Sequence, residues 1–262
     1  MIVPQFDPVA FHLGPLDVHW YGIMYLIGFA FFWLAGRSRA KKDPWRGMTP
    51  ENVEDLLFYG ILGVVLGGRL GYCLFYQPGF YFSHPAEILM VMHGGMSAHG
   101  GILGGAAAIL WYCRKSGKDF FTVSDFAVPF IPMGLFFGRI GNFINGELWG
   151  RVCSPDFIFA MVFPNAGDNL PRHPSQLYEC ALEGALLFAV LWIFSRKKRA
   201  PGMVSALFAI GYGCVRFFVE FFREPDYFLG IRALGLTQGQ WLSLPLIAAG
   251  IAVIFWAKAK RS

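Results

Sequence analysis

The sequence predicts an all-α integral membrane protein with about seven transmembrane helices and a small external cap. Of its 262 residues, 55% are hydrophobic and only 15% are charged, whereas an ordinary globular domain is roughly 25% charged. Aromatic residues make up 18% of the chain and there are 32 glycines, which is typical of proteins that anchor at bilayer interfaces and pack helices closely. These observations exclude most soluble folds, and we expect residues 1–262 to form one polytopic domain.

The chain contains seven apolar segments that we predict to be membrane helices. The third lies within Gly94–Cys113, which has 20 residues without a charge, and the last within Ala233–Ala257, which has 25. The stretch Tyr81–His93 is too short to span and is predicted to be a re-entrant or interfacial helix. The seven segments are Trp20–Gly36, Leu56–Tyr76, Met96–Cys113, Phe126–Ile144, Gln176–Phe194, Gly202–Phe222 and Gln238–Lys258.

The Lys and Arg residues between these segments predict the orientation of the chain. On one side of the membrane the loops and the C-terminal tail carry 15 of them, and on the other side the loops carry four. Because cytoplasmic loops are enriched in basic residues, the N-terminus is predicted to lie outside and the C-terminus in the cytoplasm. The longest outward loop, at about Glu147–Pro174, exceeds a plain connector and is predicted to fold as the cap.

The net charge of +5 does not indicate a nucleic-acid partner, because the basic residues occur in short clusters between apolar segments. The five cysteines have no C-x-x-C spacing. Neither a disulfide framework nor a zinc site is therefore expected.

Three arginines fall inside the predicted helices: Arg69, Arg139 and Arg216. An arginine in a bilayer costs roughly 2.5–3.5 kcal/mol on insertion scales, so each needs a partner. One interpretation is an internal ion pair, which Arg216 and Glu220 at i, i+4 spacing could form. For Arg69 this interpretation and a functional one are equally favoured.

For Arg139 the ion pair is less favoured, because its neighbours are unusual. It lies in Gly138–Arg151, whose sequence GRIGNFINGELWGR brings Arg, Asn and Glu residues together at the outer end of a predicted membrane helix. Arg139 and Asn142 are three residues apart and share a helix face, and the flanking glycines allow a ligand to approach the backbone. Such a surface suits an anion with several oxygens, such as a phosphate, which a guanidinium binds with two parallel hydrogen bonds.

Two further polar clusters have both a structural and a functional interpretation. In Met92–Gly101, His99 lies among glycines at the start of a helix and is either a hydrogen-bonded helix contact or a catalytic group. A metal site is not favoured there, because His93 and His99 are six residues apart with no carboxylate nearby. In Pro171–Glu179, the His-Pro-Ser sequence can cap the helix that follows.

Taken together, these blocks resemble the phosphatidylglycerol–prolipoprotein diacylglyceryl transferases of bacterial inner membranes. The stretch Gly138–Arg151 looks like the signature of that family, and the other blocks occur in family order from residue 19 to about 226. They are His19-Trp20-Tyr21-Gly22, Leu66–Tyr72, Gly94–Gly101, Arg172–Glu179 and Arg216–Arg223.

The resemblance implies a transfer of diacylglycerol from phosphatidylglycerol to the lipobox cysteine thiol in the signal peptide of a preprolipoprotein. The product is a thioether, and glycerol phosphate leaves. The implied partners are therefore phosphatidylglycerol, the signal peptide and the surrounding membrane lipid. No cofactor, metal or nucleic acid is implied, and the cap would be periplasmic.

The resemblance also assigns roles to residues of this chain. Arg139 and Arg216 would bind the phosphate and stabilise the leaving group, and His99 is the candidate base, with an arginine field as the alternative activator of the thiol. Asn142, Asn145 and Glu147 would hold the glycerol headgroup, Tyr21 would line the site, and Gly150 would be needed for its backbone. A supporting ion network would comprise Arg69, Glu179, Glu220 and Arg223.

A lipid or solute transporter is the alternative function, because buried Arg and Glu residues also mark translocation paths. Such transporters often consist of two related halves, and no internal repeat is visible here. An intramembrane protease is less favoured, because neither G-x-S-x-G nor H-E-x-x-H occurs.

Overall fold

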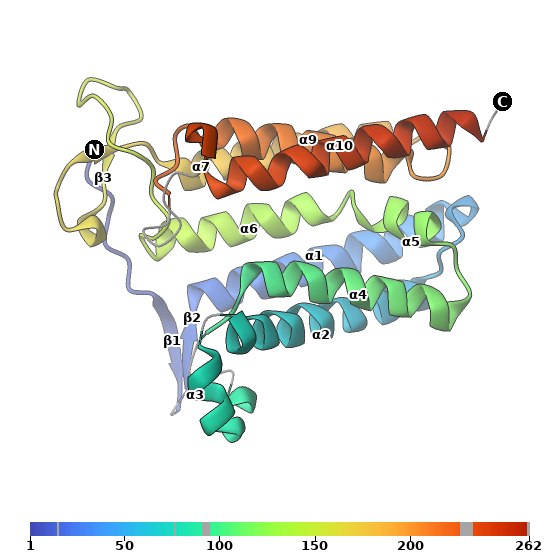
Figure 1. Ribbon diagram of the computed structural model, residues 1–262, viewed down its shortest axis with the longest axis horizontal. Coiled ribbons are helices and arrows are strands. Elements are labelled where there is room, and N and C mark those ends of the chain that lie inside the picture. Colours follow the sequence, from blue (N-terminus) through green and yellow to red (C-terminus); the bar gives the residue numbers. More distant parts are fainter. Residues whose placement is uncertain (15, 76, 91–94, 226–232, 261–262) are drawn as a thin grey trace. The chain divides into compact units, whose positions relative to one another are not determined.

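The chain is mostly helical in the computed structural model, which describes residues 1–14, 16–75, 77–90, 95–225 and 233–260 (Figure 1). It forms two compact units: unit 1 comprises residues 1–35 and 127–262, and unit 2 comprises residues 36–126. The helix α1 (Trp20–Lys42) begins in unit 1 and ends in unit 2. The prediction of a mostly helical membrane protein is confirmed, and each of the seven predicted segments overlaps a helix.

Three helical stretches of the described residues are long and apolar enough to cross a membrane: 50–74, 175–194 and 238–259. The helices α5 (Phe120–Ala127) and α6 (Ile131–Ile144) reach the same length and apolar character only together, with a bend of 45° between them. The predicted number of seven crossings stays a prediction.

Unit 2 is built around α2 (Pro50–Phe75) and α4 (Ala98–Ser116), which pack along their lengths. Glycines four residues apart on each helix allow the two backbones to touch: a Cβ built at Gly71 would lie 2.8 Å from the Gly100 Cα. Such small-residue contacts are typical of membrane helices, which are not driven together by the hydrophobic effect. In the sequence, α2 is followed by α3 (Pro78–Ser83) and η2 (Pro85–Leu89), which overlap the stretch predicted to be re-entrant or interfacial, and then by α4.

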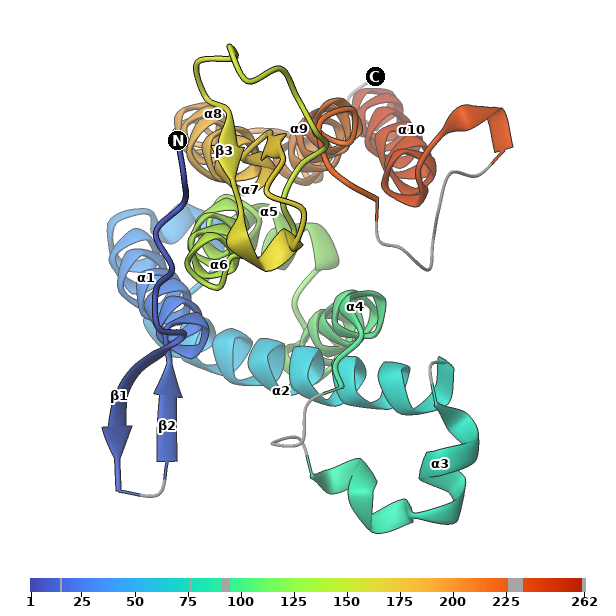
Figure 2. The ribbon, with the colours of Figure 1, turned by 90° about the vertical axis from the view of Figure 1, so that its left-hand side faces the viewer.

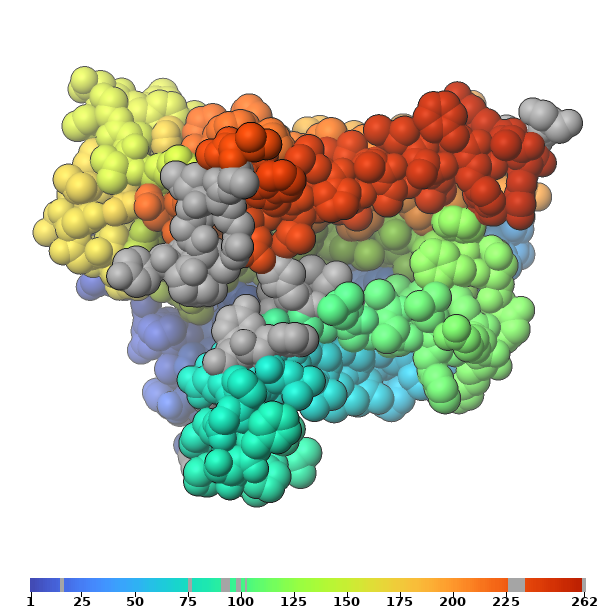
Figure 3. Space-filling view, in the orientation of Figure 1, coloured from blue at the N-terminus to red at the C-terminus, as the bar shows by residue number. Residues whose placement is uncertain are grey.

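Unit 1 contains α6, α7 (Ser175–Glu179), α8 (Leu187–Phe194), α9 (Met203–Val219) and α10 (Gln238–Ala259). A π-helical turn, η5 (Cys180–Leu186), joins α7 to α8, and Gly184 on this turn packs against Phe136 of α6. Leu187, Leu191 and Val204 form a buried apolar cluster between α8 and α9. Helices α9 and α10 lie side by side, and in the space-filling view α10 runs along the surface of unit 1 (Figures 1 and 3).

Two short sheets, which the all-α prediction did not include, lie in unit 1. The strands β1 (Val9–Leu13) and β2 (Leu16–His19) form an antiparallel hairpin directly before α1. The strands β3 (Met161–Val162) and β4 (Pro171–Arg172) pair within the segment between α6 and α7. Figure 2 looks along the helices of unit 1 and shows this segment, in yellow, across their ends.

The segment between α6 and α7 is a folded structure and not an open connector. Its chain also includes η4 (Pro164–Ala166), and the backbone of Val162 pairs with that of the N-terminal residues Met1 and Val3. Its other end is tied to the end of α9, because the Arg151 N–H donates to the Phe222 carbonyl at 2.8 Å. The remaining short elements are η1 (Pro44–Arg46) and η6 (Ala233–Gly235).

Candidate functional site: an arginine–carboxylate cluster in unit 1

The polar stretch at the C-terminal end of α6 folds back on itself. Arg139 donates from Nη1 to the Asn142 Oδ1 at 3.2 Å, and Asn142 donates from Nδ2 to the Glu147 Oε1 at 2.8 Å. Asn145 donates to the same Glu147 oxygen at 3.4 Å. The i, i+3 spacing of Arg139 and Asn142 produces the first contact, so this part of the predicted site is brought together as a chain of hydrogen bonds.

Glu179, at the end of α7, is the centre of the cluster. Its carboxylate forms an ion pair with the Arg139 Nε, accepts from the Arg216 Nη1 at 2.9 Å and lies 3.3 Å from the Arg223 Nη1. The Glu179 side chain is 1% exposed, whereas those of Arg139 and Arg216 are 17% and 15% exposed. Two guanidinium groups from α6 and α9 therefore converge on one buried carboxylate while keeping part of their surface open.

Glu183, one helical turn after Glu179, is a second buried carboxylate that the sequence analysis placed in a helix but not in the site. Its oxygens lie 3.6 Å from the Arg216 Nη1 and 3.9 Å from the Arg139 Nη2. Neither oxygen has a hydrogen-bond partner among the described residues. The residue belongs to η5, whose wider turn changes the direction of its side chain relative to an α-helix.

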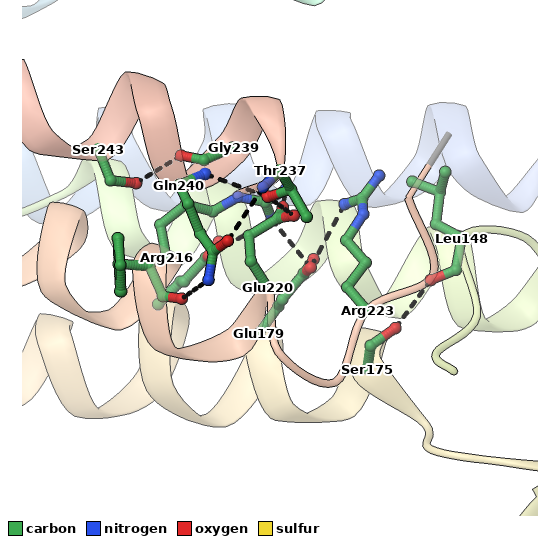
Figure 4. A network of polar contacts seen from close by, with 12 residues as sticks. Leu148, Ser175, Glu179, Arg216, Glu220, Arg223, Thr237, Gly239, Gln240 and Ser243 are labelled. Carbon is green, nitrogen blue, oxygen red and sulfur yellow. Dashed lines mark hydrogen bonds and ion pairs between the residues drawn. The ribbon is translucent and has the colours of Figure 1, made fainter. Parts of the chain in front are cut away.

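Glu220 connects the cluster to the start of α10, as Figure 4 shows. One of its oxygens pairs with the Arg216 Nη2, and the other accepts from the Thr237 hydroxyl at 2.6 Å. The ion pair between Arg216 and Glu220 that the spacing allowed is therefore present, but Arg216 also binds Glu179. Thr237 was not singled out in the sequence, because its neighbours there give no signal of a buried carboxylate.

The backbone after α6 is fixed by side chains at the start of α7. Gln176 donates from Nε2 to the Glu147 carbonyl at 2.6 Å, and Ser175 donates from Oγ to the Leu148 carbonyl at 3.0 Å. Gly150 donates to the His173 carbonyl at 2.8 Å. A Cβ at Gly150 would lie 2.5 Å from the Phe222 carbonyl oxygen, so the backbone here packs too closely for a larger residue.

Tyr21 lies in the first turn of α1, against α6. A Cβ built at Gly141 would come within 2.7 Å of the Tyr21 ring, so this glycine lets the ring pack on the helix beside Asn142. The Tyr21 hydroxyl lies 3.3 Å from that of Tyr25. Tyr21 is thus next to the polar end of α6, where the sequence placed it.

Two of the predicted residues, Arg69 and His99, belong to unit 2. Arg69 is buried, and its guanidinium donates to the carbonyls of Glu87, Ile88, Met90 and Gly95 at 2.6–3.1 Å. These contacts hold the chain before α4. The expected place of Arg69 in the ion network stays a prediction. The backbone of His99 is in the first turn of α4, but its side chain, like all of His93, lies outside the described residues.

Ionisable groups in the segment between α6 and α7 have shifted pKa values. A hydrogen bond from Arg172 holds the pKa of the Asp168 carboxyl below its usual range. Partial burial lowers the pKa of His173, whose Nδ1 lies 3.1 Å from the Tyr178 hydroxyl. Arg172 and Asp168 form an ion pair beside Gly150, whose carbonyl accepts from Arg172.

The arrangement suits an anion with several oxygens. Glu179 fixes Arg139 and Arg216, whose side chains remain 17% and 15% exposed. Guanidinium groups bind phosphate oxygens through paired N–H bonds. Among the described residues, no group of three His, Cys, Asp or Glu side chains is placed to hold a metal ion.

Comparison with known proteins agrees with this geometry. The sequence model of the family described as prolipoprotein diacylglyceryl transferase matches residues 8–256. A phosphatidylglycerol–prolipoprotein diacylglyceryl transferase of Bordetella avium is 60% identical over 259 residues, covering 99% of this chain and 97% of the relative. Proteins of the same name from Nitrosomonas europaea and Cupriavidus necator are 59% and 57% identical, covering 98% and 100% of this chain and 92% and 96% of the relatives. The chain therefore belongs to the prolipoprotein diacylglyceryl transferase family.

Proposed function

We propose that this chain transfers the diacylglyceryl group of phosphatidylglycerol to the lipobox cysteine of a preprolipoprotein signal peptide. Family membership and the names of its relatives support this substrate pair. The observation that carries the proposal is the convergence of Arg139 and Arg216 on Glu179, since it fixes two partly open cations in a helix bundle. The same observation suits catalysis better than translocation, because a fixed cation stabilises developing charge without reorganising.

In the proposed reaction, the sulfur of the peptide thiol attacks the glycerol carbon that bears the phosphate. A carbon–sulfur bond forms, the carbon–oxygen bond to the phosphate breaks, and glycerol phosphate leaves with the electron pair. The thiol loses its proton, and the product is a thioether. Negative charge grows on the departing phosphate oxygen, and this is where a cation stabilises the transition state more than the ground state.

Arg139 and Arg216 are the residues proposed to bind that phosphate. Asn142, Asn145 and Glu147, which are already linked by hydrogen bonds to one another and to Arg139, would hold the hydroxyls of the glycerol headgroup. Tyr21 would line the site, and Gly150 would keep the backbone close to Phe222 and His173. Glu179, Glu220, Arg223 and Arg69 would form the supporting ion network, in which Glu179 and Glu220 fix the two arginines.

The thiol needs activation, because a free cysteine has a pKa of about 8.5 and the thiolate is the nucleophile. His99 is the proposed base, and the field of the arginines is the alternative. The nucleophile belongs to the substrate, so no cysteine of this chain is required.

We further propose that the protein resides in the bacterial inner membrane as one polytopic domain with seven crossings. Its N-terminus and the cap at residues 147–174 would face the periplasm, and its C-terminus the cytoplasm. The distribution of basic residues supports this orientation.

The test is product formation by the purified protein in vesicles that contain phosphatidylglycerol and a lipobox peptide. We expect the peptide to gain one diacylglyceryl group by mass spectrometry and glycerol phosphate to appear in equal amount. A peptide with serine in place of the lipobox cysteine, and vesicles of phosphatidylethanolamine alone, are the controls. Movement of labelled lipid between leaflets without any product would favour the transporter and overturn the proposal.

A further inference from the structure

Glu220 is held by two donors on different helices. Arg216 of α9 pairs with one carboxylate oxygen, and the Thr237 hydroxyl, at the N-cap of α10, donates to the other. We propose that Thr237 is a positioning residue for the transfer: it fixes Glu220, which in turn fixes the Arg216 guanidinium. This inference rests on the proposed role of Arg216 in binding the phosphate.

Burial makes the contact between Thr237 and Glu220 hard to replace. The two residues are 3% and 4% exposed, so a carboxylate oxygen that lost its donor would have little access to water. Gly239 packs directly on the same carboxylate, because a Cβ at this position would lie 2.5 Å from the Glu220 Cδ (Figure 4). The first turn of α10 thus closes over Glu220.

The Thr237 hydroxyl has two separate roles. As a donor it binds Glu220 at 2.6 Å, and as an acceptor it receives the Gln240 N–H at 3.2 Å. Gln240 completes the capping box, because its Oε1 accepts the Thr237 N–H at 3.0 Å. The start of α10 is therefore locked to the carboxylate that Arg216 binds.

Loss of the donor should act on catalysis and not only on folding. Without it, the buried Glu220 oxygen is left unsatisfied and the carboxylate turns towards a new partner. Arg216 then loses the fixed orientation in which it meets the phosphate. Because that contact strengthens in the transition state, kcat should fall more than KM for phosphatidylglycerol rises.

The experiment compares Thr237→Val, which has nearly the shape of threonine but no hydroxyl, with Thr237→Ser, which keeps both hydroxyl roles. In mixed micelles with varied phosphatidylglycerol content, we expect Thr237→Val to lower kcat about tenfold or more, the effect of a lost charge-assisted hydrogen bond. Thr237→Ser should stay within about threefold of the wild type. Gln240→Met is the matched control, since it removes the capping-box side chain but leaves the Thr237 hydroxyl on Glu220.

Two results would overturn the inference: a kcat of Thr237→Val equal to that of the wild type, or a loss of kcat in Gln240→Met equal to that in Thr237→Val.

If Thr237→Val does not accumulate, Thr237→Asn and Thr237→Asp are compared instead. Both side chains cap a helix, but only the amide of asparagine can donate to Glu220. The kcat of Thr237→Asn must then exceed that of Thr237→Asp at least tenfold, and equal rates would contradict the inference. An inactive wild type would instead reject the proposed function.

Discussion

Arg139 uses different nitrogens for different partners, and this makes its replacement by lysine informative. Its Nε pairs with Glu179 while its Nη1 donates to Asn142. Lysine keeps the charge but has one nitrogen and no planar fork. If Arg139 also grips phosphate oxygens, Arg139→Lys should lower the transferase rate roughly 10- to 150-fold, the equivalent of one charge-assisted hydrogen bond of about 1.5–3 kcal/mol.

The rate is measured at equal membrane abundance, with Arg139→Ala alongside. Alanine should be worse than lysine, because α6 would then present no cation to the leaving phosphate. A lysine variant as fast as the wild type would reduce Arg139 to the partner of Glu179 and leave the phosphate to Arg216.

Glu179 and Glu183 are both buried, but they differ in how closely they are paired. Glu179 directly contacts Arg139, Arg216 and Arg223, whereas the guanidinium nitrogen closest to Glu183 among the described residues is 3.6 Å away. Removing one partner from a buried ion pair costs about 3–5 kcal/mol. Glu179→Gln should therefore lower the Tm in detergent by roughly 10 °C, at roughly 2–4 °C per kcal/mol for a chain of this size.

Glu183→Gln serves as the comparison, since it removes a carboxylate of equal burial one helical turn further along the chain, in η5. Its Tm should fall clearly less, because no hydrogen bond is broken at Glu183. Equal losses for the two variants would contradict the view that Glu179 is the centre of the cluster.

At this scale, the sequence predicted the contacts that depend on local spacing. Arg139 with Asn142, and Arg216 with Glu220, lie three and four residues apart, and both pairs are present. Thr237 and Glu183 were missed for different reasons. Thr237 reaches Glu220 across two packed helices, and the direction of Glu183 depends on a π-helical turn that no hydrophobic pattern announces.

At the scale of elements, the pair α2 and α4 depends on glycines at the contact. A Cβ at Gly67 would lie 2.7 Å from the Gly104 Cα, whereas one at Gly60, on the same helix, would meet nothing within 4 Å. Gly67→Ala should thus force the helices apart and cost about 1–3 kcal/mol, the usual effect of overpacking. Gly60→Ala should be neutral or stabilise by up to about 1 kcal/mol through helix propensity.

Thermal unfolding of the two alanine variants in the same detergent measures the difference. Each adds one methyl group to α2, so any general effect of alanine on this helix cancels in the comparison. A Tm for Gly67→Ala equal to that of Gly60→Ala would show that the close approach is not needed for stability.

The elements themselves were more predictable than their details. The length of the apolar segments located the helices, because a membrane helix needs about 20 mostly apolar residues. The hairpin of β1 and β2 was missed, since the residues of its two short strands follow no long alternating pattern. The chain before α4 was predicted as a short helical stretch, and the role of Arg69 in holding it rests on carbonyl groups that a sequence does not display.

At the scale of the whole molecule, the arginine cluster and the basic loops give independent information: the cluster defines the candidate site, and the loops indicate the orientation in the membrane. The cluster unites residues that are up to 84 positions apart in the chain, from Arg139 to Arg223, around Glu179. The basic loops say on which side of a membrane the ends of the helices lie. The orientation can be predicted directly from the composition of the loops, and it does not depend on the reaction proposed for the arginine cluster.

The orientation of the chain can therefore be tested separately from the reaction. With 15 Lys and Arg residues on one side and four on the other, Lys197 should face the cytoplasm and Asp156 the periplasm. Both residues are exposed, so cysteine can replace either in a background in which the five native cysteines have been replaced. A membrane-impermeant thiol reagent added to intact cells with a permeable outer membrane should label Asp156→Cys but not Lys197→Cys. Lysis should make Lys197→Cys reactive, which confirms that the thiol is accessible once the barrier is broken. Labelling of Lys197→Cys alone in intact cells would invert the topology and place the cap between α6 and α7 in the cytoplasm.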